Sequence, residues 1–245
     1  MIKLSKIYRS SYTGEDIVVE RSYTDGVWHD TTETVPNAVT NNQISNQAVV
    51  IGNGPGRLGI NLAAIKNHQG GLLGARALQS YGCNALFRDF TPDFLVATGN
   101  DVVKEIANAG YTTDNIVYTD AVHALEYPGK FYLIPHNPYA DAGTAAAYIA
   151  AFDGHKKVYL IGFDGNNTEG YNHNVYAGTP GYQPINSTVD AKKWDAALAS
   201  LFATYDDTEF IQVTEFGNDT IPASWLSCVN FRQISIREFV LEVDL

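Results

Sequence analysis

The fold is decided by one stretch, Ala48-Val49-Val50-Ile51-Gly52-Asn53-Gly54-Pro55-Gly56-Arg57-Leu58-Gly59. Its first four residues are apolar and mostly β-branched, which favours a buried strand. A glycine-rich turn follows, and residues 60–65 are typical of the start of a helix. A strand, a glycine turn and a helix together present backbone N–H groups to an anion, because glycine lets the backbone approach it closely. The stretch therefore predicts a nucleotide-type ligand.

From residue 47 onward, β-like and α-like segments alternate. We expect strands at 47–51, 78–83, 93–98, 115–119, 131–135, 157–162 and 208–214, and helices at 59–67, 100–109, 142–153 and 188–204. Several of these strands are almost continuous apolar runs, which is typical of parallel strands covered on both faces. The predicted fold class is α/β: a Rossmann-like, mostly parallel sheet with helices on both faces, a β-rich N-terminal arm and a C-terminal β extension.

The N-terminal 46 residues are more polar than the rest of the chain. Two β-like runs, Asp16–Tyr23 and Val27–His29, flank the turn pair Asp25-Gly26. This arrangement predicts a hairpin or an extended arm. Residues 35–42 are interpreted as an extended connector.

The C-terminal tail, from Cys228 to Val243, is interpreted as one or two further strands. With it, we expect three parts: a β-rich arm at 1–46, a nucleotide-binding domain at 47–215 and a C-terminal extension at 216–245.

Composition limits the classes of function. The chain has 245 residues, is 45% hydrophobic and carries a net charge of −11. A chain of this size can form one large α/β domain with a good core. The excess of acidic residues disfavours nucleic-acid binding, because phosphate contacts need basic side chains. The two cysteines, Cys83 and Cys228, form no zinc-type pattern. No apolar leader or membrane-length run occurs, so we expect an intracellular soluble protein with no membrane partner.

Polar residues follow four of the predicted strands. They are Gly52, Asn53 and Gly54 after the first strand, Asn84 after the second, Asn100 after the third and Asp164 after the sixth. Because the carboxyl ends of parallel strands meet at one edge of the sheet, where open α/β sheets bind ligands, we expect a binding cleft there. Asparagine suits such a cleft, since it offers both a donor and an acceptor. The alternative is that these residues only end strands and begin helices.

Residues 135–144 form a further junction between a strand and a helix. Asp141 is expected to cap the helix predicted at 142–153. The backbone N–H groups of Gly143 and Thr144, together with the Thr144 hydroxyl, are candidates to bind an anion.

Residues 165–187 form a long loop rich in Gly, Asn, Tyr and Pro. A loop of this length is typical of a lid, a binding loop or a partner contact. It contains His173 and three tyrosines, Tyr171, Tyr176 and Tyr182. His173 is the first candidate for a catalytic base and His136, at a strand end, is the second. The alternative is that both are solvated loop histidines. The acidic residues are dispersed, so no metal site and no required cofactor are expected.

Gly54 to Gly59 also matches the dinucleotide fingerprint G-x-G-x-x-G. That fold needs an acidic residue about 20 positions later to hold the ribose hydroxyls. No Asp or Glu occurs from Ile60 to Arg88, although Arg76 would suit a 2′-phosphate. A nicotinamide enzyme is therefore disfavoured.

Three sets of segments form a pattern: Ile51–Pro55, then Gly82–Phe87 with Thr91–Phe94, then Gly143–Ala151 with Lys157–Asp164. Over roughly residues 47–215 this pattern resembles the bacterial sialyltransferases of the Campylobacter type. It is also similar to the related domain of 6-hydroxymethylpterin diphosphokinase-like proteins and of flagellin-modifying accessory proteins. The resemblance implies a nucleotide-sugar-binding glycosyltransferase-like protein that takes a CMP-sugar and needs no metal for catalysis.

The resemblance also implies roles for the candidate residues. Asn53 and Gly54 would contact the nucleotide phosphate and ribose, Asn84 would reach the sugar-phosphate, and Gly143 and Thr144 would lie by the nucleotide. The loop tyrosines would bind the phosphate leaving group. The chain differs from the family at three places: the serine after GNGP is Gly56, the asparagine at the third strand end falls near Gly99 with Asn100 beside it, and the catalytic histidine falls near Thr179, with His173 nearby.

The whole chain, including the tail segment 230–233, also resembles proteins encoded by marine tailed phages. This resemblance implies a phage context and an alternative function, a virion structural or accessory protein that keeps the fold without catalysis. Its location would then be the cytoplasm of the host cell or the virion, and its partners virion proteins or further copies of itself. A pterin-type diphosphokinase is a third possibility, which would need magnesium and acidic ligands such as Asp101 and Asp164.

Overall fold

The protein is built around one large parallel sheet. A computed structural model describes residues 2–8, 16–35, 45–66, 77–136, 138, 140–164, 173–185, 191–217 and 219–245. Eight strands lie in the order β11-β10-β9-β4-β5-β6-β7-β8, and every pair is parallel. The bounds are β4 Gln47–Ile51, β5 Gln79–Cys83, β6 Phe94–Val96, β7 Ile116–Thr119, β8 Tyr132–Leu133, β9 Lys157–Ile161, β10 Glu209–Thr214 and β11 Phe231–Ser235. The predicted α/β, Rossmann-like fold is confirmed.

The strand order reverses between β4 and β9. From β4 the chain adds β5, β6, β7 and β8 on one side, and then returns to place β9, β10 and β11 on the other. In open α/β sheets the point of reversal leaves a crevice at the carboxyl ends of the two strands. The glycine turn after β4 and Asp164 after β9 both lie at this point.

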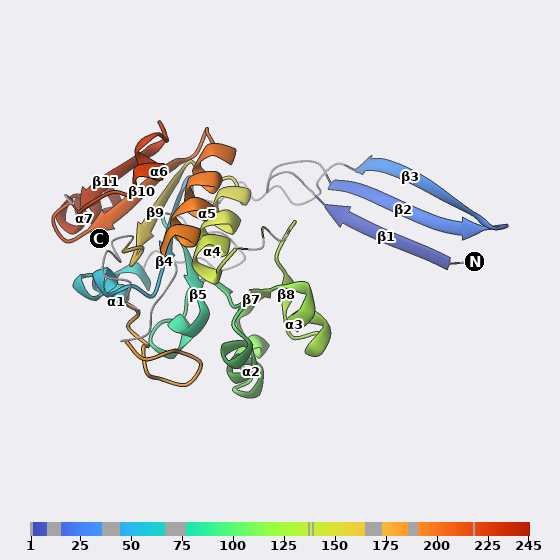
Figure 1. Cartoon of the computed structure of the whole chain (residues 1–245), viewed down its shortest axis with the longest axis horizontal. Coiled ribbons are helices and arrows are strands. Elements are labelled where there is room, and N and C mark those ends of the chain that lie inside the picture. Colours follow the sequence, from blue (N-terminus) through green and yellow to red (C-terminus); the bar gives the residue numbers. More distant parts are fainter. Residues whose placement is uncertain are drawn as a thin grey trace.

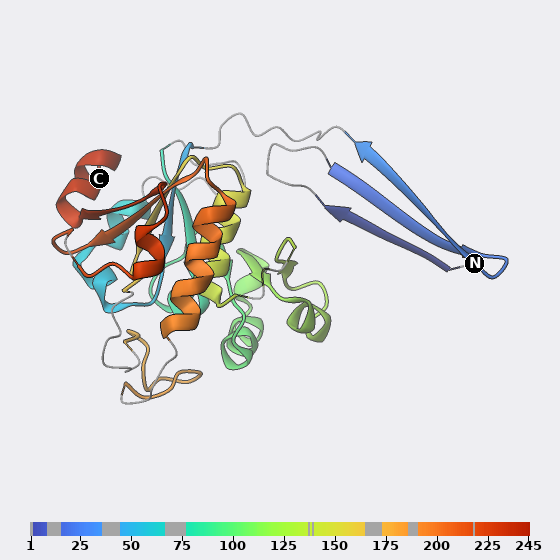
Figure 2. The same ribbon diagram turned by 45° about the horizontal axis from the view of Figure 1, so that its top comes forward.

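Helices cover both faces of the sheet (Figures 1 and 2). One face packs against α4 (Ala142–Phe152), α5 (Ala191–Thr204) and α6 (Ala223–Leu226). The other face packs against α1 (Leu62–Lys66), α2 (Asn100–Asn108) and α7 (Ile236–Val243). The short helix α3 (Ala121–Glu126) precedes the edge strand β8. Three 3-10 helices, η1 (Pro55–Gly59), η3 (Asn84–Arg88) and η4 (Tyr111–Thr113), begin shortly after β4, β5 and α2.

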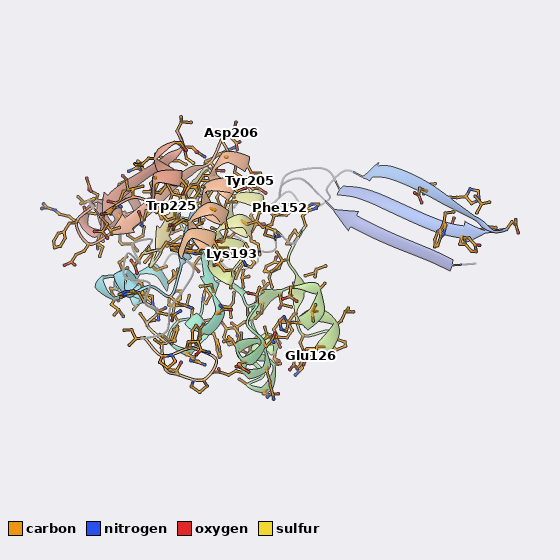
Figure 3. The ribbon with its side chains drawn as sticks, in the orientation of Figure 1. Glu126, Phe152, Lys193, Tyr205, Asp206 and Trp225 are labelled. Carbon is orange, nitrogen blue, oxygen red and sulfur yellow. The ribbon has the colours of Figure 1, made fainter. Side chains whose placement is uncertain are left out.

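Helix α4 lies close to the sheet because its side chains are small. Six of its eleven residues are alanine, and all six are buried. Larger side chains fill the space farther out: Trp225 of α6 is fully buried and its ring lies 5.7 Å from that of Phe202. Figure 3 shows Trp225, Tyr205 and Phe152 on this side of the sheet. The position of α4 fixes its N-terminus at the carboxyl edge, beside Phe163, since a Cβ at Gly143 would lie 3.6 Å from that ring.

The N-terminal strands form a separate antiparallel sheet. Its strands are β1 (Ile2–Tyr8), β2 (Asp16–Thr24) and β3 (Val27–Val35), in that order. Asp25 and Gly26 both have positive φ angles, of 54° and 81°, as a two-residue type I′ turn requires. The predicted hairpin is thus confirmed, whereas β1 was not predicted. From residue 36 the predicted connector lies outside the described residues.

The prediction of the C-terminal tail was only half right. β11 adds a strand beside β10, but residues 236–243 form helix α7 and not a second strand. The helix begins with a capping box, in which Ser235 Oγ accepts from the Glu238 backbone N–H and the Glu238 carboxylate accepts from the Ser235 backbone N–H. None of the helices in the described part of the chain has the length and apolar character needed to cross a membrane.

Candidate functional site

The glycine turn is held against the end of β9 by backbone hydrogen bonds. Gly52 N–H donates to Ile161 O over 2.7 Å, and Gly54 N–H donates to Gly162 O over 3.0 Å. Gly162 has a φ of +69°, which bends the chain after β9 toward the turn. A Cβ at Gly52 would lie 2.6 Å from Gly162 O, so only glycine allows this approach. The turn is therefore fixed at the point where the strand order reverses.

Asp164 lies inside the turn. Its Oδ2 accepts a 2.9 Å hydrogen bond from the Gly56 backbone N–H. A Cβ at Gly54 would lie 2.0 Å from Oδ2, and a Cβ at Gly56 would lie 2.2 Å from Oδ1. Burial raises the pKa of the Asp164 carboxyl, and the Gly56 hydrogen bond and the charge of His173 oppose this rise. A carboxylate of the chain itself thus occupies part of the space in which glycine turns often hold an anion.

Asn53 provides the least satisfied polar group of the turn. Its side chain is 8% exposed, and Nδ2 donates to Cys83 O and to the Tyr182 hydroxyl, each over 3.3 Å. The bond to Cys83 O fixes the amide orientation, because the opposite one would bring two acceptors together. Among the residues that the structure describes, no donor reaches the buried Oδ1 atom. Because a buried acceptor without a partner is costly, Oδ1 is a natural contact for a hydroxyl or N–H of a ligand.

Two loop tyrosines pack over this edge of the sheet. Val175 N–H donates to Asn53 O over 2.8 Å, which ties the loop to the turn. The Tyr182 hydroxyl accepts from Asn53 Nδ2 and from Ala85 N–H, and its ring lies 5.7 Å from that of Tyr176. Burial raises the pKa of both tyrosines above the ordinary value, so both stay protonated and can donate.

A pair of arginines that sequence reasoning missed lies behind these tyrosines. Arg57, in η1, is 3% exposed, and its guanidinium carbon lies 5.0 Å from the centre of the Tyr176 ring. Arg57 Nη2 donates to Asp89 Oδ2 over 2.6 Å and to the Tyr176 hydroxyl over 2.8 Å. Arg88 pairs with Glu105 and donates to Thr179 Oγ1 and Pro180 O. A basic residue directly after a glycine turn was the available signal for Arg57.

The other predicted residues bind mainly to the protein itself. Asn84 has a φ of 46°, and its Oδ1 accepts from Thr98 N–H over 3.2 Å. Asn100 Oδ1 lies 2.7 Å from His123 Nε2, on the opposite side of the ring from Asp120. These contacts hold the ends of β5, β6 and β7 together.

The N-terminus of α4 is capped as predicted. Asp141 Oδ1 accepts from the N–H groups of Gly143 and Thr144, and Oδ2 accepts from the Thr144 hydroxyl. The donors predicted to meet an anion therefore already bind a carboxylate. Burial raises the pKa of the Cys83 thiol to about 12, Asp141 raises it further and Arg57 lowers it. The α4 N-terminus, the end of β5 and the glycine turn are thus close enough to interact.

The two predicted bases lie in different places. His173 is exposed and lies close enough to Asp164 for its charge to lower the pKa of that carboxyl. The His136 ring lies 6.1 Å from that of Phe152, the last residue of α4, at the opposite end of this helix from Gly143. Tyr171 lies outside the described residues. Within the described ranges, no group of three or more His, Cys, Asp or Glu side chains is placed to hold a metal ion.

Comparisons with known proteins identify no relative. No family model, no curated protein and no solved structure matches the chain. The functional argument therefore depends on the site itself.

Proposed function

We propose that the chain binds a nucleotide sugar at the carboxyl edge of the eight-stranded sheet and transfers its glycosyl group. The observation that carries the proposal is the buried Asn53 Oδ1, which lacks a donor among the described residues at the point where the strand order reverses. A ribose or sugar hydroxyl is the kind of donor that would satisfy it. The resemblance of the 47–215 segments to bacterial sialyltransferases favours a CMP-sugar.

The loop tyrosines suit a nucleotide leaving group. Tyr182 accepts two hydrogen bonds from the protein, from Asn53 and Ala85, so its own hydroxyl hydrogen is available to a ligand oxygen. Donors fixed before the reaction stabilise the negative charge that develops on a departing phosphate. Because the Tyr182 hydroxyl is fixed by the turn, it requires little rearrangement.

His173 is the better placed of the two predicted bases. In a direct displacement, an acceptor hydroxyl attacks the anomeric carbon, the bond to the phosphate oxygen breaks, and the base takes the hydroxyl proton. His173 lies by Asp164 at the reversal point, whereas His136 contacts the far end of α4. His173→Ala is expected to abolish transfer and to leave nucleotide binding unchanged.

The proposal is tested by thermal unfolding with a panel of CMP, CDP, UDP, GDP, ATP and NADP, each with and without Mg²⁺. A ligand at 100 times its Kd stabilises by about 2.7 kcal/mol, which is a shift of a few degrees for a chain of this size. A shift with CMP that does not need Mg²⁺ supports the proposal. A shift with ATP that requires Mg²⁺ supports the diphosphokinase alternative, and no shift with any nucleotide contradicts both.

The second candidate function is a virion structural or accessory role. It is favoured by the β1–β3 sheet, whose strands pair only with one another among the described residues. Such a sheet is a suitable docking element for another protein. If this function is correct, mass spectrometry of purified particles should find the chain in stoichiometric amounts. Its absence from particles would exclude this role.

A further inference from the structure

Arg57 is a buried cation with more donors than partners. A guanidinium has five N–H donors. In the described part of the chain, the partners of Arg57 are Asp89 and Tyr176, and both bind Nη2. The Nε and Nη1 atoms are buried and have no hydrogen-bond partner there. Three N–H donors of a fixed positive charge are therefore unused.

Such an arrangement is unfavourable unless an acceptor completes it. A buried charge loses its hydration, and the loss is recovered only when hydrogen bonds replace the water. The one carboxylate paired with Arg57, that of Asp89, belongs to a side chain that is half exposed. The Tyr176 ring covers the guanidinium, and Tyr176 itself is 6% exposed. The missing acceptor must therefore lie between η1 and the loop residues 175–182.

We propose that Arg57 binds a phosphate-type oxyanion through Nε and Nη1, and that this is a site separate from Asn53 Oδ1. A tetrahedral oxyanion offers several acceptors in different directions, which suits donors that do not share one edge of the guanidinium. Tyr176 moves aside when the anion enters, because its ring covers the donors. The anion is either free phosphate or the phosphate of a nucleotide, and the inference holds whether or not the chain transfers a sugar.

The test is thermal unfolding of the full chain in increasing sodium orthophosphate, or in increasing CMP, with NaCl added to keep the ionic strength constant. The variants are Arg57→Gln and Asp89→Asn, with Lys104→Gln as the control that removes an exposed positive charge from α2. In the wild type and in Lys104→Gln, the melting temperature is expected to rise and then saturate. In Arg57→Gln the half-saturating concentration is expected to increase about tenfold or more, since a charge-assisted hydrogen bond is lost.

Asp89→Asn has the opposite expected effect. Removing the carboxylate that competes for Arg57 lowers the half-saturating concentration, even though the melting temperature without anion falls. This arm decides the question if Arg57→Gln does not fold: tighter binding in Asp89→Asn supports the site, and unchanged binding overturns it. An Arg57-dependent response to CMP alone supports the site and identifies the nucleotide as the source.

Two other outcomes overturn the inference. One is no response of the wild type to either probe, and the other is an equal response in Arg57→Gln. If CMP binding depends on Asn53 and not on Arg57, the proposed function stands and the oxyanion site at Arg57 is rejected. The two proposals therefore fail independently.

Discussion

The Gly56 backbone N–H donates to the Asp164 carboxylate over 2.9 Å, across the point where the strand order of the sheet reverses. This contact explains two glycines of the turn. Neither needs glycine for a left-handed backbone, since Gly54 has a φ of −72° and Gly56 is not among the residues with positive φ. Both are instead required because Asp164 lies against their α carbons.

The two glycines should respond differently to substitution by alanine. A Cβ at position 54 would lie 2.6 Å from the backbone oxygen of Gly162 as well as 2.0 Å from Asp164, whereas at position 56 Asp164 alone is closer than 3 Å. Each substitution is expected to lower the free energy of unfolding by about 1–3 kcal/mol, the usual cost of overpacking. Adding Asp164→Ala should restore stability to Gly56→Ala but not to Gly54→Ala. Urea unfolding of the double-mutant cycle measures this, and equal rescue at both positions would contradict the geometry.

His155 is expected to make the fold sensitive to acid. Its Nδ1 lies 2.6 Å from Ser45 O, and its Nε2 lies 3.0 Å from the Tyr81 hydroxyl, which donates to Asp153. Burial lowers the pKa of His155 from 6.5 to about 4. Between these values the unfolded chain binds more protons than the folded one, so stability is complete above pH 6.5 and decreases as the pH falls toward 4. The loss amounts to about 3 kcal/mol.

The measurement for His155 is urea unfolding of the wild type and of His155→Gln at pH 7.5 and pH 5. Because glutamine does not titrate, the advantage of the wild type over the variant should shrink at pH 5. An advantage that is equal at both pH values would show that His155 is not buried as a neutral ring.

Asp195 should give a pH effect of the opposite sign. Burial raises its carboxyl pKa from 3.8 to about 6, and its Oδ1 has no hydrogen-bond partner in the described ranges. Between these values the folded chain binds more protons than the unfolded one, so this contribution to stability is lost as the pH rises through 6. Asp195→Asn is expected to increase the free energy of unfolding at pH 8 by about 1–2 kcal/mol and by less at pH 5.

The control for this prediction is Asp206→Asn, at an exposed position, which should change the stability little at either pH. Chemical denaturation at the two pH values separates the outcomes. A lower stability of Asp195→Asn at pH 8 would mean that the carboxylate has a partner that is essential for the fold.

Much of the fold could be predicted because its signals are local. The apolar run of β4 and the turn after it lie next to each other in the sequence, and Asp141 caps α4 three residues or fewer from its partners. Helix α7 also had a local signal that was overlooked: Ser235 and Glu238 form a capping box, and Ile236, Phe239, Val240 and Val243 have helical spacing. Its β-branched residues favoured a strand and outweighed that spacing.

The contacts of the site could not be predicted in the same way. Arg57 and Asp89 are 32 residues apart, and Arg57 and Tyr176 are 119 residues apart. Such pairs depend on how the sheet places η1, η3 and the loop side by side, which no pattern in a single sequence encodes. The same is true of Asp164, whose contact with Gly56 spans 108 residues and fills the turn that alone predicted an anion.

The most direct test of the account is isothermal titration of CMP into the wild type and Asn53→Ala, without Mg²⁺, with the exposed Asn108→Ala as the matched control. The account predicts that the wild type and Asn108→Ala bind with equal affinity and that Asn53→Ala binds about tenfold or more weakly, because the buried acceptor is lost. No binding by the wild type, or equal binding by all three proteins, would contradict it.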